Sequence, residues 1–238
     1  MKNSLSLFAF ITSVSVIFSC FGIFLSLPNE SSEVFAPQKP TQVIVIDAGH
    51  GGEDGGASSY GDVTEKELNL AIAQNLRDML TFCGLNVIMT RDEDILLYDK
   101  NSDYKGHKKS QDLAKRLEIA RSVENAILIS IHMNAFPEEK YSGLQVYFSK
   151  NHEKSFDLAN SIQTSTTSKL SPENNRRVKP ADKNIYLLDR FENVGILIEC
   201  GFLSNREEYG RLCSDEYKKE LAAVFLECIV DFTANDQR

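Results

Sequence analysis

The feature that most constrains this chain is a run of β-branched residues that ends in a histidine between glycines. Residues 43–46 read Val-Ile-Val-Ile, and they are followed by Asp-Ala-Gly-His-Gly-Gly over 47–52. Because the run is apolar without alternation, it predicts a strand that is buried on both faces. A histidine just beyond such a strand, here His50, lies at the sheet edge where α/β proteins bind ligands and metals.

The predicted elements alternate between strands and helices, which favours an α/β fold. We expect a three-layer α/β/α sandwich around a mostly parallel mixed sheet of about six strands. Strands are predicted at 42–47, 85–90, 126–131, 144–148, 185–188 and 194–200. Helices are predicted at 64–80, 112–123, 156–170 and 216–232, with long loops at 92–111 and 171–183.

The N-terminal part differs from the rest of the chain. Residues 5–27 are apolar and free of charge, and their length is near the ~20 residues that span a bilayer. Because a small-x-small cleavage site is missing, we predict an uncleaved signal/anchor segment over 1–27, and a cleaved signal peptide is the alternative. Residues 28–41 contain three prolines and are predicted to be a tether. We expect one globular domain over 42–238, exported in either case.

Charge and cysteine content exclude several classes of protein. The 238 residues carry a net charge of -8 and show no basic stripe, so nucleic acid is excluded as a partner. The five cysteines form no Cys-x-x-Cys pair, so neither a zinc knuckle nor a disulfide framework is indicated.

Two later strands also end in polar side chains. His132 follows the apolar run 126–131, and Glu199 follows the apolar residues 195–198. Taken singly, His132 is typical of a hydrogen-bonded structural histidine, and Glu199 of a carboxylate that caps a neighbouring loop. Because parallel strands converge on one crevice at their carboxyl ends, we expect both side chains to lie beside His50.

Glu65 is the fourth candidate. The sequence Thr-Glu-Lys-Glu over 64–67 has the form of a capping box, in which Glu67 reaches back to the Thr64 amide. This leaves Glu65 free to point toward the crevice. The alternative is that both glutamates are ordinary first-turn acids favoured by the helix dipole.

These four residue types together indicate a metal-dependent hydrolase. Two histidines and one carboxylate, with a fourth position open to water, are typical of a catalytic zinc site. A second carboxylate is then needed to accept a proton from the water and pass it to a leaving amine. We therefore predict that His50, Glu65 and His132 bind Zn²⁺ and that Glu199 is the catalytic carboxylate of an amide hydrolysis.

Three further residues lie at or near the ends of the predicted strands. Arg91 follows the strand 85–90 and would suit either a substrate carboxylate at the crevice rim or a surface salt bridge with a nearby aspartate. Asn134 either orients a substrate amide or shapes a turn. Cys200 should point to the face opposite Glu199, because side chains alternate along a strand.

With these motifs the chain resembles the zinc-dependent N-acetylmuramoyl-L-alanine amidases, which cleave stem peptides from the glycan strands of peptidoglycan. The resembling stretches span the predicted domain, at 46–57, 65–70, 87–91, 130–135 and 198–205. The resemblance implies that the residues matching His50, Glu65 and His132 bind zinc and that Glu199 is catalytic. Departures from the usual residues touch no proposed ligand and occur at Ala48, Glu67 and Cys200.

A finer resemblance is to the spore-cortex, germination-specific amidases. It rests on the short chain, the apolar N-terminal segment and similar sequence stretches at 141–143 and 176–187. It implies a role in forming muramic-δ-lactam, with the enzyme facing the cell wall or the space between the forespore membranes. The expected partners are peptidoglycan and the membrane, and a regulatory protein partner is left open. The alternatives are a general wall-remodelling amidase, a zinc exopeptidase and a non-catalytic wall-binding relative.

Overall fold

The fold is described from a computed structural model. It describes residues 42–236, except for 58–59, 100 and 102–105. The predicted segments 1–27 and 28–41 lie outside the described residues. Within the described part of the chain, no helix is both long enough and apolar enough to cross a membrane.

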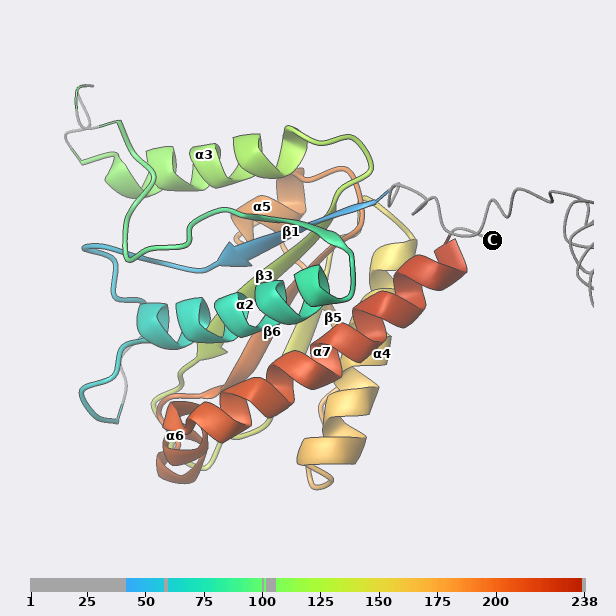
Figure 1. Cartoon of the computed structure of the whole chain (residues 1–238). Helices are drawn as coiled ribbons and strands as arrows, with labels where there is room; N and C mark the ends of the chain where they lie inside the picture. The colour runs from blue at the N-terminus through green and yellow to red at the C-terminus, as the bar shows by residue number, and fades with distance from the viewer. Residues whose placement is uncertain (1–41, 58–59, 100, 102–105, 237–238) are drawn as a thin grey trace, which may run out of the picture. The chain divides into compact units, whose positions relative to one another are not determined.

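Six strands form one mixed sheet in the order β2-β1-β3-β6-β4-β5 (Figure 1). The first four strands in this order are parallel to one another, whereas β4 runs antiparallel to β6 and β5 runs parallel to β4. The strands are β1 Val43–Ala48, β2 Asn86–Met89, β3 Ile127–Asn134, β4 Gln145–Phe148, β5 Lys179–Pro180 and β6 Gly195–Phe202. The predicted six-stranded, mostly parallel sheet is therefore confirmed.

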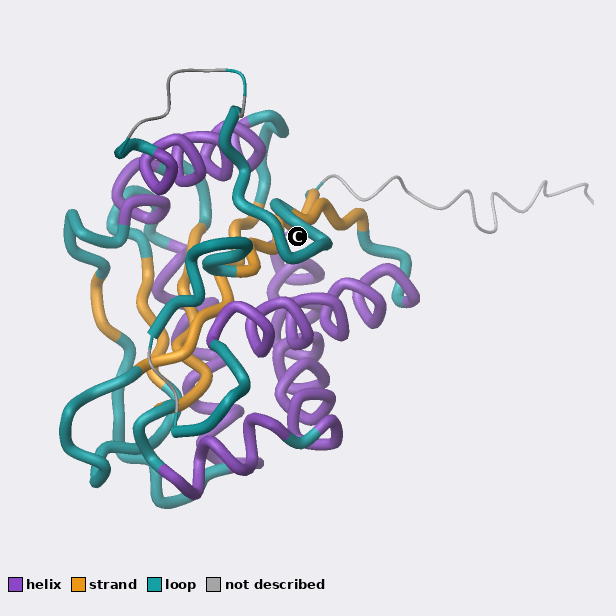
Figure 2. The backbone as a smooth tube through the Cα atoms, turned by 90° about the vertical axis from the view of Figure 1, so that its left-hand side faces the viewer, coloured by secondary structure: helices purple, strands orange, loops and turns teal. Residues whose placement is uncertain are grey.

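Helices cover both faces of this sheet, as Figures 1 and 2 show. One face packs against α2 (Glu65–Phe82), α4 (Lys154–Leu170) and α7 (Asp215–Asp236). The other face packs against α3 (Lys108–Arg121) and α5 (Tyr186–Arg190). A further short helix, α6 (Arg206–Cys213), connects β6 to α7. The predicted α/β/α sandwich is confirmed.

Alternation along the strands decides which side chains reach each layer. On β3, Ile127, Ile129 and Ile131 belong to the large apolar core beneath α2, α4 and α7. Leu128 points the other way, into the smaller core beneath α3 and α5. His132 shares the parity of Leu128, so it points toward the α3 and α5 layer.

Some local predictions are wrong. Residues 186–188 belong to α5 rather than to a strand, Ile185 is the N-cap of this helix, and Leu187 and Leu188 are buried against the sheet. A short apolar run does not by itself distinguish a buried strand from a buried helical turn. Helix α3 begins at Lys108, inside the predicted loop 92–111, and β5 lies inside the predicted loop 171–183.

Candidate metal centre

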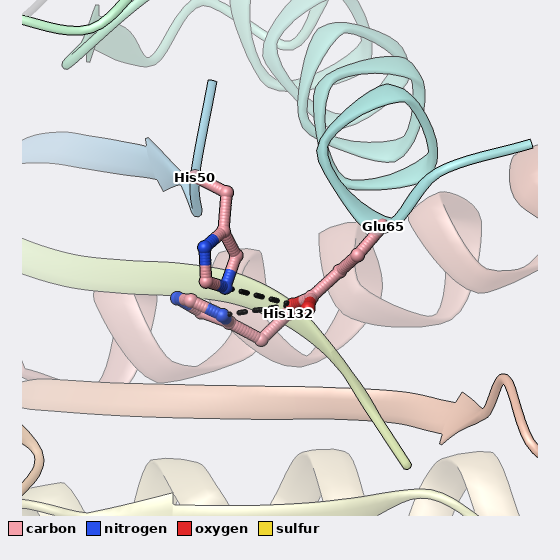
Figure 3. Close-up of side chains that lie close together, drawn as sticks. All are labelled: His50, Glu65 and His132. Atoms are coloured by element: carbon pink, nitrogen blue, oxygen red, sulfur yellow. Dashed lines mark hydrogen bonds and ion pairs between the residues drawn. The ribbon is translucent and has the colours of Figure 1, made fainter. Parts of the chain in front are cut away.

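Three side chains from three elements converge at the carboxyl edge of the sheet (Figure 3). His50 follows β1, Glu65 is the first residue of α2, and His132 lies in β3. His50 Nε2 lies 3.3 Å and His132 Nδ1 lies 3.1 Å from the same oxygen, Glu65 Oε1. Potential ligand atoms of all three residues lie within 4.8 Å of one another. The structure therefore brings together the three side chains that the sequence singled out.

This donor set fits zinc. Two imidazole nitrogens and one carboxylate oxygen are the ligands of many catalytic zinc sites, which keep a fourth position for water or substrate. The three side chains are spaced so that one ion could touch all of them, since their potential ligand atoms lie within 4.8 Å of one another. The chemistry of the donors, rather than a motif alone, therefore supports a metal centre here.

Glycines allow the ligand-bearing segments to approach one another. A Cβ on Gly49 would lie 2.2 Å from Cε1 of His132, so any side chain at this position would displace that ring. Gly56 has a φ of +82°, and a Cβ there would lie 2.4 Å from Glu65 Oε2. His50 itself adopts a φ of 61°, which is uncommon for a residue other than glycine. The glycines and this left-handed turn bring the ligand side chains together.

Glu65 is buried and fully engaged. Its Oε1 accepts a hydrogen bond from the Met133 amide at 3.0 Å, and its Oε2 accepts one from the Ala57 amide at 2.6 Å. Burial acts to raise the pKa of Glu65, but hydrogen bonds and charge from His132 and His50 outweigh it and hold the pKa below its ordinary value. Glu65 is therefore ionised, as a metal ligand must be.

The prediction that Glu67 caps the helix while Glu65 points away from the cap is confirmed. Glu67 Oε2 accepts a hydrogen bond from the Thr64 amide at 2.8 Å, at the start of α2. Glu65 points instead toward the two histidines, with 2% of its surface exposed.

Asp54 is a member of the site that the sequence prediction missed. Its Oδ2 lies 2.9 Å from His50 Nδ1, although this ion-pair contact does not have the geometry of a regular hydrogen bond. Burial acts to lower the pKa of His50, but Glu65 and then Asp54 outweigh it and raise that pKa. A carboxylate on the outer nitrogen of a metal-binding histidine fixes the ring and leaves the inner nitrogen for the metal. The only available signal was an acid four residues after His50.

Glu199 lies on β6 directly opposite His132 in the sheet register. Its Oε2 is buried and has no hydrogen-bond partner. Burial raises the pKa of Glu199 to about 7, with Glu65 adding to the rise and the two histidines opposing it. A buried carboxylate oxygen without a partner is costly, which marks Glu199 as a residue kept for a purpose other than stability.

Comparison with known proteins decides the family. Residues 44–231 match the family model for N-acetylmuramoyl-L-alanine amidases. The chain belongs to this amidase family. The amidase is 33% identical over 204 residues to the germination-specific N-acetylmuramoyl-L-alanine amidase of Bacillus subtilis (strain 168). The alignment covers 86% of this chain and 85% of that relative. The predicted family and the predicted enzyme class are confirmed.

Solved structures of the same family share the fold. The CwlD amidase from Clostridioides difficile, solved in complex with the GerS lipoprotein, is 36% identical to the amidase with a TM-score of 0.76. The match covers 81% of the amidase and 98% of the CwlD chain. The amidase AmiC2 of Nostoc punctiforme is 28% identical with a TM-score of 0.68, over 83% of this chain and 98% of that one.

The candidate metal centre of the amidase opens into a crevice of about 230 Å³. It is lined by His50, His132 and Glu199, by residues of α3 and by residues 184–187 at the start of α5. The crevice therefore lies on the α3 and α5 face of the sheet, and Glu199 is one of the residues that line it.

Arg91 lies behind the metal centre of the amidase, which corrects both sequence expectations for it. Only 2% of its surface is exposed. Its guanidinium donates hydrogen bonds to backbone carbonyl oxygens of four residues, namely Ala48, Gly49, Lys66 and Glu93. A guanidinium that is buried and engaged in this way is not available to a substrate carboxylate at the rim or to a surface salt bridge.

Asn134 and Cys200 lie in the strands that carry His132 and Glu199. Asn134 is half-buried at an irregularity in the pairing of β3 with β6, and its carbonyl accepts a hydrogen bond from the Leu203 amide at 2.8 Å. A role of its side chain toward substrate stays a prediction. Cys200 is buried in the large apolar core, on the face opposite Glu199, as predicted.

Proposed function

We propose that the amidase binds one zinc ion through His50, Glu65 and His132 and hydrolyses the amide between N-acetylmuramic acid and L-alanine in spore-cortex peptidoglycan. The observation that carries the metal part is the convergence of both imidazoles on Glu65 Oε1, at 3.3 Å and 3.1 Å. Bound zinc supplies a Lewis acid that acidifies water and polarises a carbonyl.

Glu199 is proposed as the residue that moves the proton. Glu199 lines the same crevice as both histidines, and its buried Oε2 has no hydrogen-bond partner, so this carboxyl group is available to accept a proton from the attacking water. The same carboxyl group then donates that proton to the departing alanine nitrogen, which leaves as a neutral amine. The lactyl carbonyl carbon gains the water oxygen and becomes a carboxylic acid, which then ionises by giving the second proton of the water to solvent.

The preference for a polymeric substrate is proposed from the place of the crevice at the sheet edge. Peptidoglycan lies outside the cytoplasm, so the enzyme acts there. The crevice at the sheet edge is bounded by α3 and α5 on one side and by strand ends on the other. We propose that it receives a peptide-bearing muramic acid from a long glycan strand rather than a small free peptide, which separates this function from that of a zinc exopeptidase.

The proposed cortex role rests on likeness to two proteins. One is the germination-specific amidase of B. subtilis, and the other is the C. difficile CwlD amidase. Removing the stem peptide exposes the muramic acid carboxylate, which is the group that a later deacetylation and cyclisation would convert to muramic-δ-lactam. The C. difficile relative was solved with a lipoprotein, which supports a further proposal that an exported protein partner binds this amidase.

Attachment to the membrane is proposed on the sequence alone. The apolar stretch 5–27 precedes the described residues and is long enough to span a bilayer. The mature protein should therefore fractionate with membranes and keep its N-terminus. Recovery of a soluble form that begins near Val34 or Ala36 would show a cleaved signal peptide instead.

The bond is tested by digesting purified peptidoglycan with the full-length protein and analysing the fragments by mass spectrometry. We expect free stem peptides that begin with L-alanine and glycan strands that carry free lactyl carboxylates. Peptides that retain muramic acid would show a glycosidase and contradict the proposal. In a spore-forming host, deletion should remove muramic-δ-lactam from the cortex, and persistence of the lactam would overturn the cortex role while leaving the amidase chemistry intact.

A further inference from the structure

Two buried arginines bind the backbone of the segment that presents His50. Arg116 donates to the carbonyl oxygens of Ala48 at 2.7 Å and His50 at 2.6 Å. Arg91 donates to the carbonyl oxygens of Ala48 at 2.8 Å and Gly49 at 2.9 Å. Each of the three successive carbonyls at 48–50 therefore accepts at least one hydrogen bond from a guanidinium. We call Arg91 and Arg116 the arginine pair.

The charge of Arg116 is balanced from two elements. Its Nη1 lies 2.8 Å from Asp47 Oδ1 at the end of β1, and its Nε lies 2.7 Å from Asp112 Oδ2 one turn earlier in α3. Asp47 also accepts hydrogen bonds from Ser130 at 2.6 Å and Thr90 at 2.7 Å. This network fixes the position of Arg116 relative to β1, β2, β3 and α3.

Arg91 connects the His50 segment to the helix that carries Glu65. Besides Ala48 and Gly49, its Nη2 donates to the carbonyl oxygen of Lys66 at 2.9 Å, in the first turn of α2. One guanidinium therefore contacts the backbone next to two of the three proposed ligands. Its position sets the spacing between the segment of His50 and the start of α2.

The His50 segment needs such support. His50 has a φ of 61°, a conformation that persists only where the surroundings determine it. The carbonyls of the last residue of β1 and of the two residues after it also need donors. A lysine is a poor substitute, because its donors share one nitrogen and do not spread over acceptors in several directions as a planar guanidinium does.

We propose that Arg91 and Arg116 are positioning residues for the metal centre, which hold His50 and the first turn of α2 at the metal-binding spacing before any metal arrives. The proposal rests on the metal part of the proposed function. Neither residue is assigned contact with substrate. Their effect is on metal affinity and coordination geometry, and the alternative is that they stabilise the fold alone.

Arg91→Lys is the decisive variant. The acceptors of Arg91 in the structure are backbone carbonyls, so the change leaves no buried carboxylate without its ion-pair partner. Arg116→Lys is the companion, which keeps a positive charge beside Asp47 and Asp112. The zinc dissociation constant of metal-stripped full-length protein is measured by competition with a chromophoric chelator. The visible absorption spectrum of the Co²⁺-loaded protein reports coordination geometry independently of activity.

Two controls separate positioning from general stability. Arg121→Lys changes an exposed arginine at the end of α3, the helix that carries Arg116. Arg121 pairs with Glu192 away from the site. Phe225→Leu lowers stability through the large apolar core. We expect zinc binding about 10- to 100-fold weaker and an altered Co²⁺ spectrum in both arginine-pair variants. Neither control should change either readout, although Phe225→Leu should lower the thermal midpoint.

Each outcome decides between the two roles. Wild-type zinc affinity and an unchanged Co²⁺ spectrum in Arg91→Lys would overturn the positioning role alone. An equal loss of affinity in Phe225→Leu would also overturn it, because general destabilisation would then explain the effect. If Arg116→Lys does not fold, Arg91→Lys decides. Failure of the wild-type protein to bind zinc would overturn the proposed metal centre and the positioning role with it.

Discussion

The two faces of the sheet are built from the same strands but differ in what they bury. Beneath α2, α4 and α7 lies one continuous apolar core, to which β1, β3 and β6 contribute alternate residues. Beneath α3 and α5 the core is smaller, and toward the carboxyl ends of the strands it gives way to buried charge. Asp47 and Arg116 each expose only 1% of their surface there. The comparison indicates that one face supplies most of the stability while the other positions the chemistry.

This difference has a physical reason. Burial of apolar surface stabilises a fold without regard to direction. Burial of an ion pair contributes little net stability, because desolvation offsets the attraction, but the pair has a fixed geometry. The polar face is therefore suited to holding His50 and Glu199 in place, and the apolar face is suited to holding the domain together.

Glu199→Gln tests the polar face most strongly. The amide is nearly isosteric but does not accept the proton of the attacking water, so turnover should fall about 10²- to 10⁴-fold. Zinc content and thermal midpoint should stay at wild-type values, as measured by metal analysis and calorimetry. Glu192→Gln, at an exposed carboxylate that pairs with Arg121, is the matched control. Near-normal rates in Glu199→Gln would move the proton-transfer role to another residue.

Phe225→Ala tests the apolar face. Phe225 is fully buried in α7, and truncation of a buried phenylalanine typically lowers the free energy of unfolding by about 3–5 kcal/mol. Denaturant titration measures this loss, and the zinc affinity of the remaining folded protein should be unchanged. A parallel loss of zinc affinity would show that the two faces are coupled and would break the comparison.

Asp54→Ala tests the support of a single ligand. Loss of the carboxylate beside His50 Nδ1 should weaken zinc binding about 10- to 100-fold, with little change in stability. Chelator competition gives the affinity. Glu53→Ala removes the adjacent acid, which is exposed and pairs with Lys108, and should leave zinc affinity unchanged. Equal affinities in the two variants would exclude Asp54 from the site.

The smallest expected effect is a pH dependence of stability. Burial acts to raise the pKa of Asp47, but Arg116, His132 and the hydroxyls of Ser130 and Thr90 lower it from 3.8 to about 2. The ionised form therefore stabilises the fold above pH 4, and this contribution is lost as the pH falls toward 2. In Asp47→Asn, the metal-free protein should lose stability less steeply over this interval. The free energy of unfolding is measured by denaturant titration at each pH. The same dependence on pH in Asp47→Asn as in the wild-type protein would contradict the lowered pKa.

The sequence was informative wherever a local pattern determines the result. Apolar runs that end in His50, His132 and Glu199 predicted both the buried strands and the edge where these side chains meet. The capping box at Thr64 is also a local pattern: it assigns Glu67 to the Thr64 amide and so predicted that Glu65 points toward the same edge. Short apolar runs were less informative. Residues 186–188 lie in helix α5 rather than in the predicted strand, because period and length do not separate a buried helical turn from a strand in so short a run.

The support of the site was not predictable in this way. Arg116 lies 66 residues from the His50 carbonyl that it contacts, and Arg91 lies 42 residues from that of Gly49. No local period encodes such a pairing, because it depends on how β1, α2 and α3 pack. An arginine in a polar helix is typical of a solvated surface, and only the tertiary structure shows that Arg116 is buried.

The most direct test is a zinc titration of the metal-stripped full-length protein, with release of L-alanine-terminated stem peptides from peptidoglycan as the readout. We expect turnover near zero without metal and a rise to a plateau at about one zinc per chain, the stoichiometry of a site with three protein ligands. His132→Ala should show no such rise, whereas His107→Ala, at an exposed histidine, should follow the wild-type curve. Full turnover by protein that holds no metal would contradict the assignment of the polar face to metal-dependent catalysis.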